Sequence, residues 1–288
     1  MAKVLPLFPF PMKNPLPTSK SLVRKPFVSL LSMGALCFSV MSGASAAPLL
    51  SEYFDYADGD LLTVSGGAWV LNSGSTPLNV SSGRAITTFA NSQDDARAFT
   101  PVSSGSLYYG LTATVTAAPS ANGSYFATLW DGETGAANDY FGRLQIAQGS
   151  TSTKFKLGII NDSGNAVVYS GAEFDLNTTV RIVVKFDFTT MTSTLWINPT
   201  GEGSSSVTDS VAAVFSTTVD GETSVPGGIT TMGNILLRQA SGIGTTAIDG
   251  LVVSTSFADV SAVPEPGMIA LAALGIGALF LNSRRRRV

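Results

Sequence analysis

The fold is decided by the stretch Val180-Arg181-Ile182-Val183-Val184-Lys185-Phe186-Asp187-Phe188. Every second residue of this stretch is apolar, while Arg181, Lys185 and Asp187 fall on the other face and Val183 is the exception. Because side chains alternate between the two faces of a strand, the pattern predicts a strand with one buried face. Residues 189–192 then predict a turn into a second strand at 193–197, which Asn198-Pro199 ends.

The rest of the central region repeats this kind of pattern in short pieces separated by Gly, Ser, Asn and Asp. Leu107 to Thr116 alternates apolar residues with threonine, and 161–165 predicts a hairpin turn between strands at 154–159 and 166–169. A turn is expected at 57–60 and a Gly/Ser loop at 200–206. Further strands are expected at 51–56, 66–71, 78–80, 84–89, 125–130, 140–147, 211–215, 234–239 and 246–254. No long segment has a helical period, so we expect an all-β sandwich or closed barrel.

The beginning of the chain predicts a secretory signal peptide. Lys20, Arg24 and Lys25 form its positive region, and Phe27 to Met41 is apolar over the length of a signal peptide. Ala44-Ser45-Ala46 has the small-x-small pattern of a signal peptidase site, so cleavage is expected after Ala46 or Ala47. A membrane anchor is the less favoured alternative, because the apolar stretch is short. Translation could start at Met1 or at Met12.

The end of the chain has three parts in a fixed order. Val263-Pro264-Glu265-Pro266-Gly267 is a break that no helix or central strand crosses, because of its two prolines. Met268 to Leu281 carries no charge and predicts a hydrophobic, transmembrane helix, although a full crossing needs about 20 residues. Arg284, Arg285, Arg286 and Arg287 follow, and the positive-inside rule places them in the cytoplasm. A buried C-terminal helix is the alternative, but it explains neither the prolines nor the arginines.

These signals divide the chain into residues 1–47, a globular domain at 48–262, and a C-terminal signal at 263–288. The globular part holds eight Lys or Arg against nineteen Asp or Glu, a net charge of −11. Such an acidic surface argues against nucleic acid as a partner. The one cysteine, Cys37, lies in the signal peptide, so the exported domain has no disulfide.

The chain contains no histidine. Its absence excludes Ser-His-Asp and Cys-His catalysis, histidine-based zinc or copper sites, and haem held by histidine. An enzyme would therefore depend mainly on carboxylates. Glycoside hydrolases on sandwich folds resembling the laminarinases carry a Glu-x-Asp-x-x-Glu strand, and this spacing does not occur here. We therefore expect a protein that is not an enzyme.

The C-terminal residues closely resemble the PEP-CTERM sorting signal of Gram-negative bacteria. The motif Pro264-Glu265-Pro266, the apolar segment and the arginine tail all match it. The resemblance implies that an exosortase, a membrane cysteine protease, recognises the motif and removes the tail. It also implies an address at the cell surface or in extracellular polysaccharide.

The central region resembles the LamG-like domains linked to PEP-CTERM and autotransporter proteins. The segments that carry the resemblance are 53–56, 180–188, 195–199 and 248–253. It implies a concanavalin A-like jelly roll, in which two antiparallel sheets pack face to face. This fold serves lectins, adhesion modules and glycoside hydrolases alike, so it does not decide the function.

One acidic loop is a candidate ligand or calcium site. Asp131, Glu133 and Asp139 lie in this loop between Trp130 and Tyr140. Calcium takes six to eight oxygen ligands, which such a loop could contribute in part. A solvated loop is the simpler interpretation. No other cofactor is expected, and Asp58 and Asp60 beside Gly59 are better explained by a turn than by calcium.

Aromatic side chains are the second set of candidates, because their amphipathic rings can stack on sugars. The set consists of Tyr53, Phe54, Tyr56, Trp69, Trp130, Tyr140 and Trp196. In alternating strands such residues more often belong to the core, an interpretation that fits Phe54 and Trp196 better than Trp130 and Tyr140.

The sequence thus predicts a non-enzymatic protein exported from a Gram-negative bacterium. Signal peptidase and exosortase are its expected processing partners, with transient anchoring in the cytoplasmic membrane before release to the surface or matrix. It is expected to contact extracellular polysaccharide, and carbohydrate binding is one role. A glycan-active hydrolase and a purely structural matrix component are the alternatives.

Overall fold

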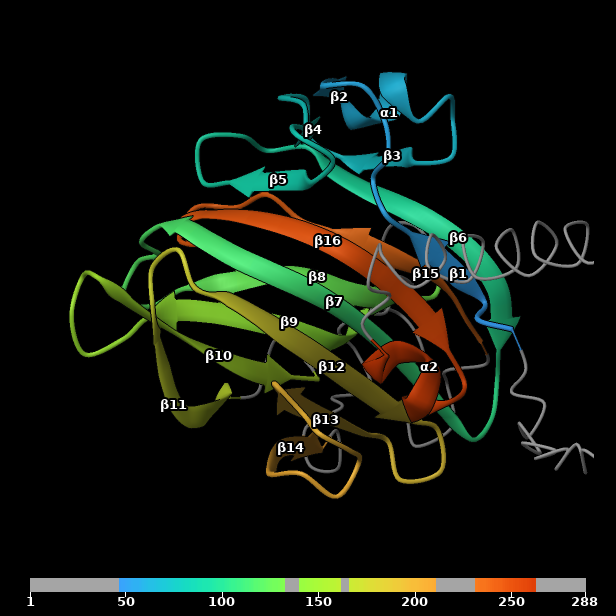
Figure 1. The fold of residues 1–288 in the computed structure, drawn as a ribbon. Helices are drawn as coiled ribbons and strands as arrows, with labels where there is room; N and C mark the ends of the chain where they lie inside the picture. Colours follow the sequence, from blue (N-terminus) through green and yellow to red (C-terminus); the bar gives the residue numbers. More distant parts are fainter. Residues whose placement is uncertain (1–46, 133–139, 162–165, 211–230, 263–288) are drawn as a thin grey trace, which may run out of the picture. The chain divides into compact units, whose positions relative to one another are not determined.

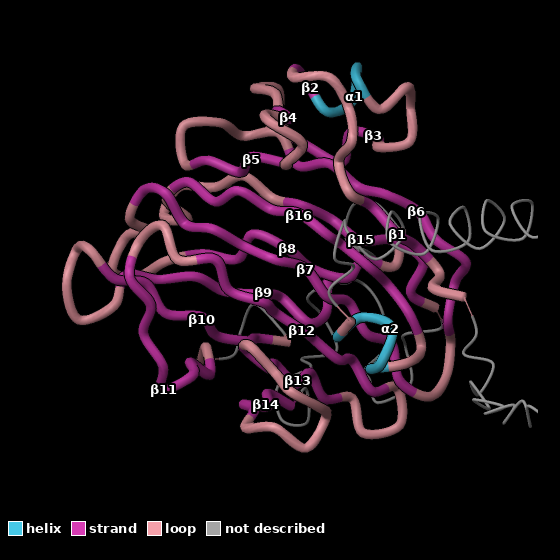
Figure 2. Tube along the Cα trace, in the orientation of Figure 1, coloured by secondary structure: helices cyan, strands magenta, loops and turns pink. Residues whose placement is uncertain are grey.

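The computed structural model describes residues 47–132, 140–161, 166–210 and 231–262. These residues form two antiparallel β-sheets that pack face to face, with two short helices (Figures 1 and 2). The predicted all-β jelly-roll sandwich is therefore confirmed, and the closed barrel is not formed. The C-terminal hydrophobic helix that the sequence predicts lies outside the described residues.

One sheet has nine strands, in the order β14-β13-β12-β7-β16-β5-β4-β2, with β1 also paired to β16. Its central strands β7, β12 and β16 come from distant parts of the sequence and lie side by side (Figure 1). The strands are β1 Leu50–Glu52, β2 Gly59–Asp60, β4 Asn79–Val80, β5 Ala85–Thr88, β7 Ser106–Ala117, β12 Thr179–Asp187, β13 Thr192–Ile197, β14 Ser206–Ser210 and β16 Thr245–Ser254.

The other sheet has seven strands, in the order β11-β10-β9-β8-β15-β6-β3. The strands are β3 Val70–Ser73, β6 Asp94–Val102, β8 Ser124–Trp130, β9 Tyr140–Gln148, β10 Lys154–Ile160, β11 Val168–Asp175 and β15 Met232–Leu237. Each sheet has an inner face, which meets the other sheet, and an outer face.

The core lies between the inner faces, and the predicted alternation selects its residues. Val180, Ile182, Val184 and Phe186 of β12 are fully buried, as are their counterparts at every second position of β7 from Leu107 to Val115. Phe186 meets Phe141 of the opposite sheet, with ring centroids 5.0 Å apart. Fully burying a side chain of this kind stabilises the fold by about 1.5–3 kcal/mol.

Val183, the exception in the alternation, lies on the outer face of the nine-stranded sheet. There it is covered by helix α2, Phe257–Ser261, which lies across β7, β12 and β16 (Figure 1). The helix and the sheet enclose a second, smaller cluster made of Tyr108, Val183, Trp196, Val252, Phe257 and Val260. An apolar residue on the outer face is thus explained by a helix that the sequence pattern did not predict.

Several elements differ from those expected from the sequence. Strand β6 and helix α1, Leu61–Val64, were not predicted, and β14 begins inside the expected loop at 200–206. Asp60, expected in a turn, ends β2 and caps α1 by accepting a hydrogen bond from Leu62 N at 3.1 Å. The predicted hairpin turn at 161–165 and the predicted strand at 211–215 lie wholly or mostly outside the described residues.

Candidate functional site

Most of the candidate aromatic residues belong to the core. Phe54 and Trp69 are buried and stack on each other at 5.8 Å, and Trp196 is buried beneath α2. Tyr56 is half-buried, and Tyr53 is 39% exposed with no aromatic neighbour among the described residues. The prediction of a core role is therefore confirmed for Phe54 and Trp196, and it also holds for Trp69.

Trp130 and Tyr140 lie together on the outer face of the seven-stranded sheet. The register places Trp130 opposite Tyr140 of β9 on one side and Asn234 of β15 on the other. The rings of Trp130 and Tyr140 stack with centroids 6.3 Å apart and 21° between their planes. Ala96 and Leu236 complete this outer-face cluster.

The indole N–H of Trp130 is the unusual atom of this cluster. Trp130 is only 8% exposed, and its Nε1 is buried with no hydrogen-bond partner among the described residues. Leaving a buried donor unsatisfied costs about 1–3 kcal/mol. Trp69 Nε1 and Trp196 Nε1, by contrast, donate to Glu52 and to the Glu202 carbonyl at 2.9 and 3.0 Å. The outer face therefore carries a buried donor that no described residue satisfies.

Arginines and a tyrosine lie next to this cluster. The guanidinium carbon of Arg238 lies 4.2 Å from the centroid of the Tyr125 ring, and that of Arg143 lies 5.3 Å from the same centroid. Arg143 also lies 5.6 Å from the ring of Tyr140. Through these cation–π contacts, two guanidinium groups lie against the ring of the half-buried Tyr125.

Asp94 forms an ion pair with Arg238, whose Nη1 also donates to Ser124 Oγ at 2.9 Å. It lies 3.7 Å from Arg238 Nε and accepts hydrogen bonds from Ser73 Oγ at 3.1 Å and from Gln239 N at 3.0 Å. Burial raises the pKa of Asp94, against the lowering effect of these bonds and of Arg238. Asp94 therefore orients Arg238 and Gln239 while its own acceptor sites are already in use.

The predicted acidic loop is described only in part. Asp131 directly follows Trp130 at the end of β8 and is half-buried, whereas Glu133 and Asp139 lie outside the described residues. Among the residues that the structure describes, no group of three acidic, cysteine or histidine side chains could hold a metal ion. Calcium binding by this loop stays a prediction. Asp58 has a structural partner, since it accepts from Ser82 N at 2.7 Å.

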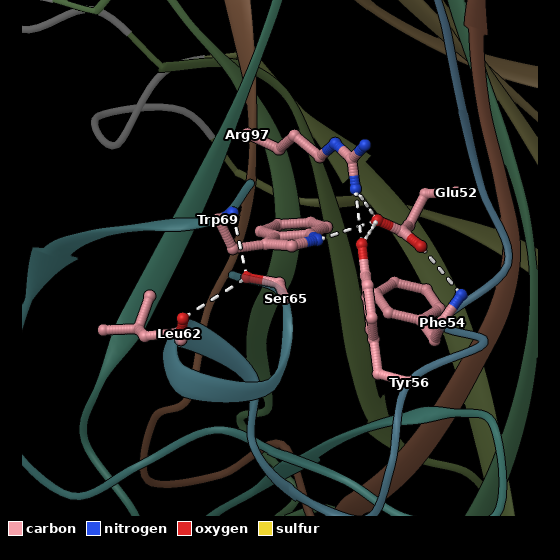
Figure 3. A network of polar contacts seen from close by, with 7 residues as sticks. All are labelled: Glu52, Phe54, Tyr56, Leu62, Ser65, Trp69 and Arg97. Carbon is pink, nitrogen blue, oxygen red and sulfur yellow. Dashed lines mark hydrogen bonds and ion pairs between the residues drawn. The ribbon is translucent and has the colours of Figure 1, made fainter. Parts of the chain in front are cut away.

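A buried polar cluster around Glu52 is the feature that the sequence did not indicate (Figure 3). The Glu52 carboxylate accepts from Phe54 N at 2.8 Å, Tyr56 Oη at 2.9 Å and Trp69 Nε1 at 2.9 Å. It also forms an ion pair with Arg97, whose pKa burial lowers. The Arg97 contact joins β1 to β6 of the other sheet, while the other three contacts lie within residues 52–69. With its acceptor sites filled, Glu52 acts as a structural link and is not free for catalysis.

The predicted sorting and processing residues lie outside the described residues, with the exception of Ala47. They are Ala44, Ala46, Pro264, Glu265, Pro266 and the arginines from Arg284 to Arg287, whereas Ala47 is described and exposed. No helix in the described part of the chain combines the length and apolar character that a membrane crossing needs.

Similar solved structures are lectins and enzymes at low identity. The chain is 10% identical to the winged bean acidic lectin, with a TM-score of 0.44 over 71% of this chain and 96% of the lectin. It is 10% identical to the lectin UEA-II, with a TM-score of 0.42 over 72% and 99%. For a sialidase the identity is 10% and the TM-score 0.41, over 73% of this chain and only 19% of the enzyme. The fold class rests on the two sheets described above.

The sequence comparisons concern the end of the chain. No curated protein matches this sequence. The model of the PEP-CTERM protein-sorting motif matches residues 262–287, the region for which the same motif was predicted. The chain therefore carries a PEP-CTERM protein-sorting motif at its C-terminal end.

Proposed function

We propose that this protein is an exported, non-enzymatic polysaccharide-binding protein of the bacterial surface or extracellular matrix. Its sorting motif supports the location at the cell surface or in the matrix. Signal peptidase and exosortase would be the processing partners, and the cytoplasmic membrane would be a transient anchor. The outer face of the seven-stranded sheet is the binding surface. This face combines half-buried tyrosine rings with the N–H groups of arginine and tryptophan, which suits the apolar faces and polar edges of sugars.

The observation that carries the proposal is the unsatisfied Nε1 of Trp130. Trp130 lies between Tyr140 and Asn234 on this face, and a sugar oxygen would reach its buried Nε1 after a small movement of these neighbours. The other two tryptophan donors are paired within the fold, so the unsatisfied donor of Trp130 supports a polar partner at this position.

A glycan array with the Trp130→Phe variant tests the proposal. The substitution keeps an aromatic ring against Tyr140 but removes the donor. Because the donor has no partner among the described residues, we expect unchanged or slightly higher stability, together with about fivefold weaker glycan binding. Running the array with and without calcium also tests the predicted role of the Asp131 loop.

Trp196→Phe is the matched control. Its indole N–H donates to the Glu202 carbonyl at 3.0 Å on the other sheet. We expect the reverse outcome, a loss of about 1 kcal/mol in stability with unchanged glycan binding. No glycan bound by the wild type, or equal binding by Trp130→Phe, would contradict the proposal. Release of product from any polysaccharide would show an enzyme instead.

A further inference from the structure

The C-terminal end of the sandwich is held against the outer face of the nine-stranded sheet. Helix α2 ends at Ser261, and the backbone of Ala262 is extended. The N–H of Ala262 still donates to the carbonyl of Ala258 at 3.1 Å. The matched sorting motif begins at Ala262, so this residue belongs both to the fold and to the signal.

One side chain of the sheet holds this end of the chain. Nη2 of Arg181, on β12, donates to the carbonyl of Ala262 at 3.0 Å and also to that of Val260. The Arg181 backbone is fixed in turn, because its N–H donates to Asn198 Oδ1 at 2.8 Å and its carbonyl accepts from Asn198 N at 2.8 Å. The carbonyls in the last turn of a helix have no partner within the helix, and an arginine can supply one. We name the contacts of Arg181 with Val260 and Ala262 the clamp.

The neighbouring strand β7 leaves room for the clamp. A Cβ atom on Gly110 would collide with the carbonyl oxygen of Val260. Because the collision is with backbone, it could be relieved only by moving the end of α2 away from the sheet. The side chain of Val260 is fully buried in the cluster beneath the helix. Glycine on one strand and arginine on the next therefore fix the same carbonyl.

The clamp is a contact that can open at its outer end. Burial lowers the pKa of Arg181, and its Nε is buried with no hydrogen-bond partner among the described residues. None of the ion pairs in the described part of the chain involves Arg181, so its partners there are neutral carbonyls. Ala262 is exposed, and water can replace its carbonyl when this residue moves away. Such an opening leaves the buried ring of Phe257 in place.

The core of the sorting motif follows directly after the clamp. Val263 is the one residue between Ala262 and Pro264. Two residues of chain reach at most about 7 Å, even when fully extended. Binding sites are concave and enclose most of the group that they bind. An enzyme that encloses the motif would therefore collide with the sandwich as long as Ala262 is held on the sheet.

We propose that Arg181 controls the removal of the tail, because the processing enzyme can bind the motif only after the clamp has opened. This inference rests on the proposed function, in which an exosortase removes the tail. When opening is fast relative to cleavage, proteolysis follows the population of the open form, so the strength of the clamp sets the rate of processing. The folded domain thus slows its own release and stays longer at the membrane.

Pulse labelling of the full-length chain in its host tests this inference, with mass spectrometry to separate the tail-bearing form from the shortened one. Arg181→Met keeps the aliphatic packing and removes the donors. We expect it to be shortened about tenfold faster than the wild type, because a lost hydrogen bond to a charged group shifts an equilibrium by about this factor or more. Gly110→Ala should also accelerate processing, since it displaces the Val260 carbonyl. Lys185→Gln, on the same face of β12, is the matched control and should leave the rate unchanged.

An insertion separates the effect of the clamp from any loss of folding. Six Gly and Ser residues placed after Ala262 extend the reach from Ala262 to the motif to about 28 Å and change no described contact. We expect this chain to be shortened about tenfold faster than the wild type even with the clamp closed. Adding Arg181→Met to it should give no further acceleration. Thermal unfolding of each variant checks that the sandwich is intact.

The outcomes decide between the alternatives. Wild-type rates in both Arg181→Met and the insertion chain, or slower processing of Arg181→Met, would overturn the control by the clamp. Acceleration by Arg181→Met that persists in the insertion chain would assign the effect to a weakened fold and would also overturn it. A wild-type chain that is never shortened would contradict both the exosortase step and this inference. Polysaccharide binding is measured separately on the glycan array, so that part of the proposed function is decided independently.

Discussion

Asp95 lies on β6 with its side chain fully buried. One carboxylate oxygen accepts from Gln93 Nε2 at 3.2 Å, and the other has no hydrogen-bond partner among the described residues. Burial raises the pKa of Asp95 to about 7, with the nearby carboxylates Asp60 and Asp94 adding to the rise. The folded protein therefore keeps a proton on Asp95 at a pH where the unfolded chain has lost it.

This difference predicts a stability that falls as the pH rises. Between the unfolded pKa of 3.8 and the folded value of about 7, folding requires a proton to be taken up, so each step upward in pH disfavours the folded state. Asp95→Asn cannot ionise. We expect it to raise the free energy of unfolding at pH 8 by about 2–4 kcal/mol and to flatten the pH dependence between 4 and 7. Urea unfolding across this pH range measures both effects.

Asp187 provides a control of opposite sign. Burial tends to raise its pKa, but hydrogen bonds from Thr190 N, Thr189 N and Ser106, together with Lys185, lower it overall. The stability that Asp187 contributes is present above 3.8 and is lost as the pH falls. Asp187→Asn should therefore destabilise the protein at neutral pH. If Asp95→Asn behaved in the same way, a buried protonated Asp95 would be ruled out.

The Glu52 cluster could not be predicted from the sequence, because it depends on a contact between two distant strands. The sequence predicted a strand around residues 51–56, and β1 is found there. The partner of Glu52, however, is Arg97 on β6, a strand that was not predicted. The segment Asp94-Asp95-Ala96-Arg97-Ala98 carries three charges and two alanines in five residues, so its sequence resembles a loop. It is a strand because it pairs with β15 and β3, and the local sequence pattern does not contain these pairings.

At the scale of elements, the strands with a clear alternation of apolar and polar residues were predicted, whereas the helix that covers their outer face was not. The two-residue period of β7 and β12 selects an inner face directly. Helix α2 has five residues, too few to display a helical period, and its place is set by contacts with β7, β12 and β16. The apolar residue Val183 on an otherwise polar face was the one signal in β12 that something covers it. The candidate site likewise depends on a register between β8, β9 and β15 that the sequence does not encode locally.

Helix α2 should contribute strongly to stability through a single side chain. Phe257 contacts Tyr108 at 6.1 Å and Trp196 at 5.3 Å, both edge to face, and is 8% exposed. Phe257→Ala should lower the free energy of unfolding by about 3 kcal/mol, because it removes the main cover of the cluster around Val183. The exposed neighbour Ala258 provides the control, since Ala258→Ser should change stability by less than about 0.5 kcal/mol. Equal stability of Phe257→Ala and wild type in urea would show that α2 does not seal this face.

At the scale of the molecule, the described fold reaches the first residue of the sorting motif. Arg181 Nη2, on β12, donates to the carbonyl of Ala262 at 3.0 Å and also to that of Val260. Gly110 leaves room for the Val260 carbonyl to approach the sheet. The matched motif begins at Ala262, so the last contacts of the sandwich and the start of the signal meet at one residue. Removal of the residues that follow would therefore take away none of the sandwich contacts described here.

Processing should accordingly change the mass of the protein and leave its stability unchanged. Mass spectrometry of the protein from its host should find an N-terminus near Ala47 or Pro48 and no Arg284 to Arg287. The processed protein should unfold at the same temperature as the domain 48–262, because every described contact of α2 is kept. A shorter chain ending at Ser256 should unfold at a clearly lower temperature, since it uncovers Val183 and Trp196. Recovery of the arginine tail on the mature protein would contradict removal by an exosortase, and equal stability of the two shorter chains would contradict the role of α2.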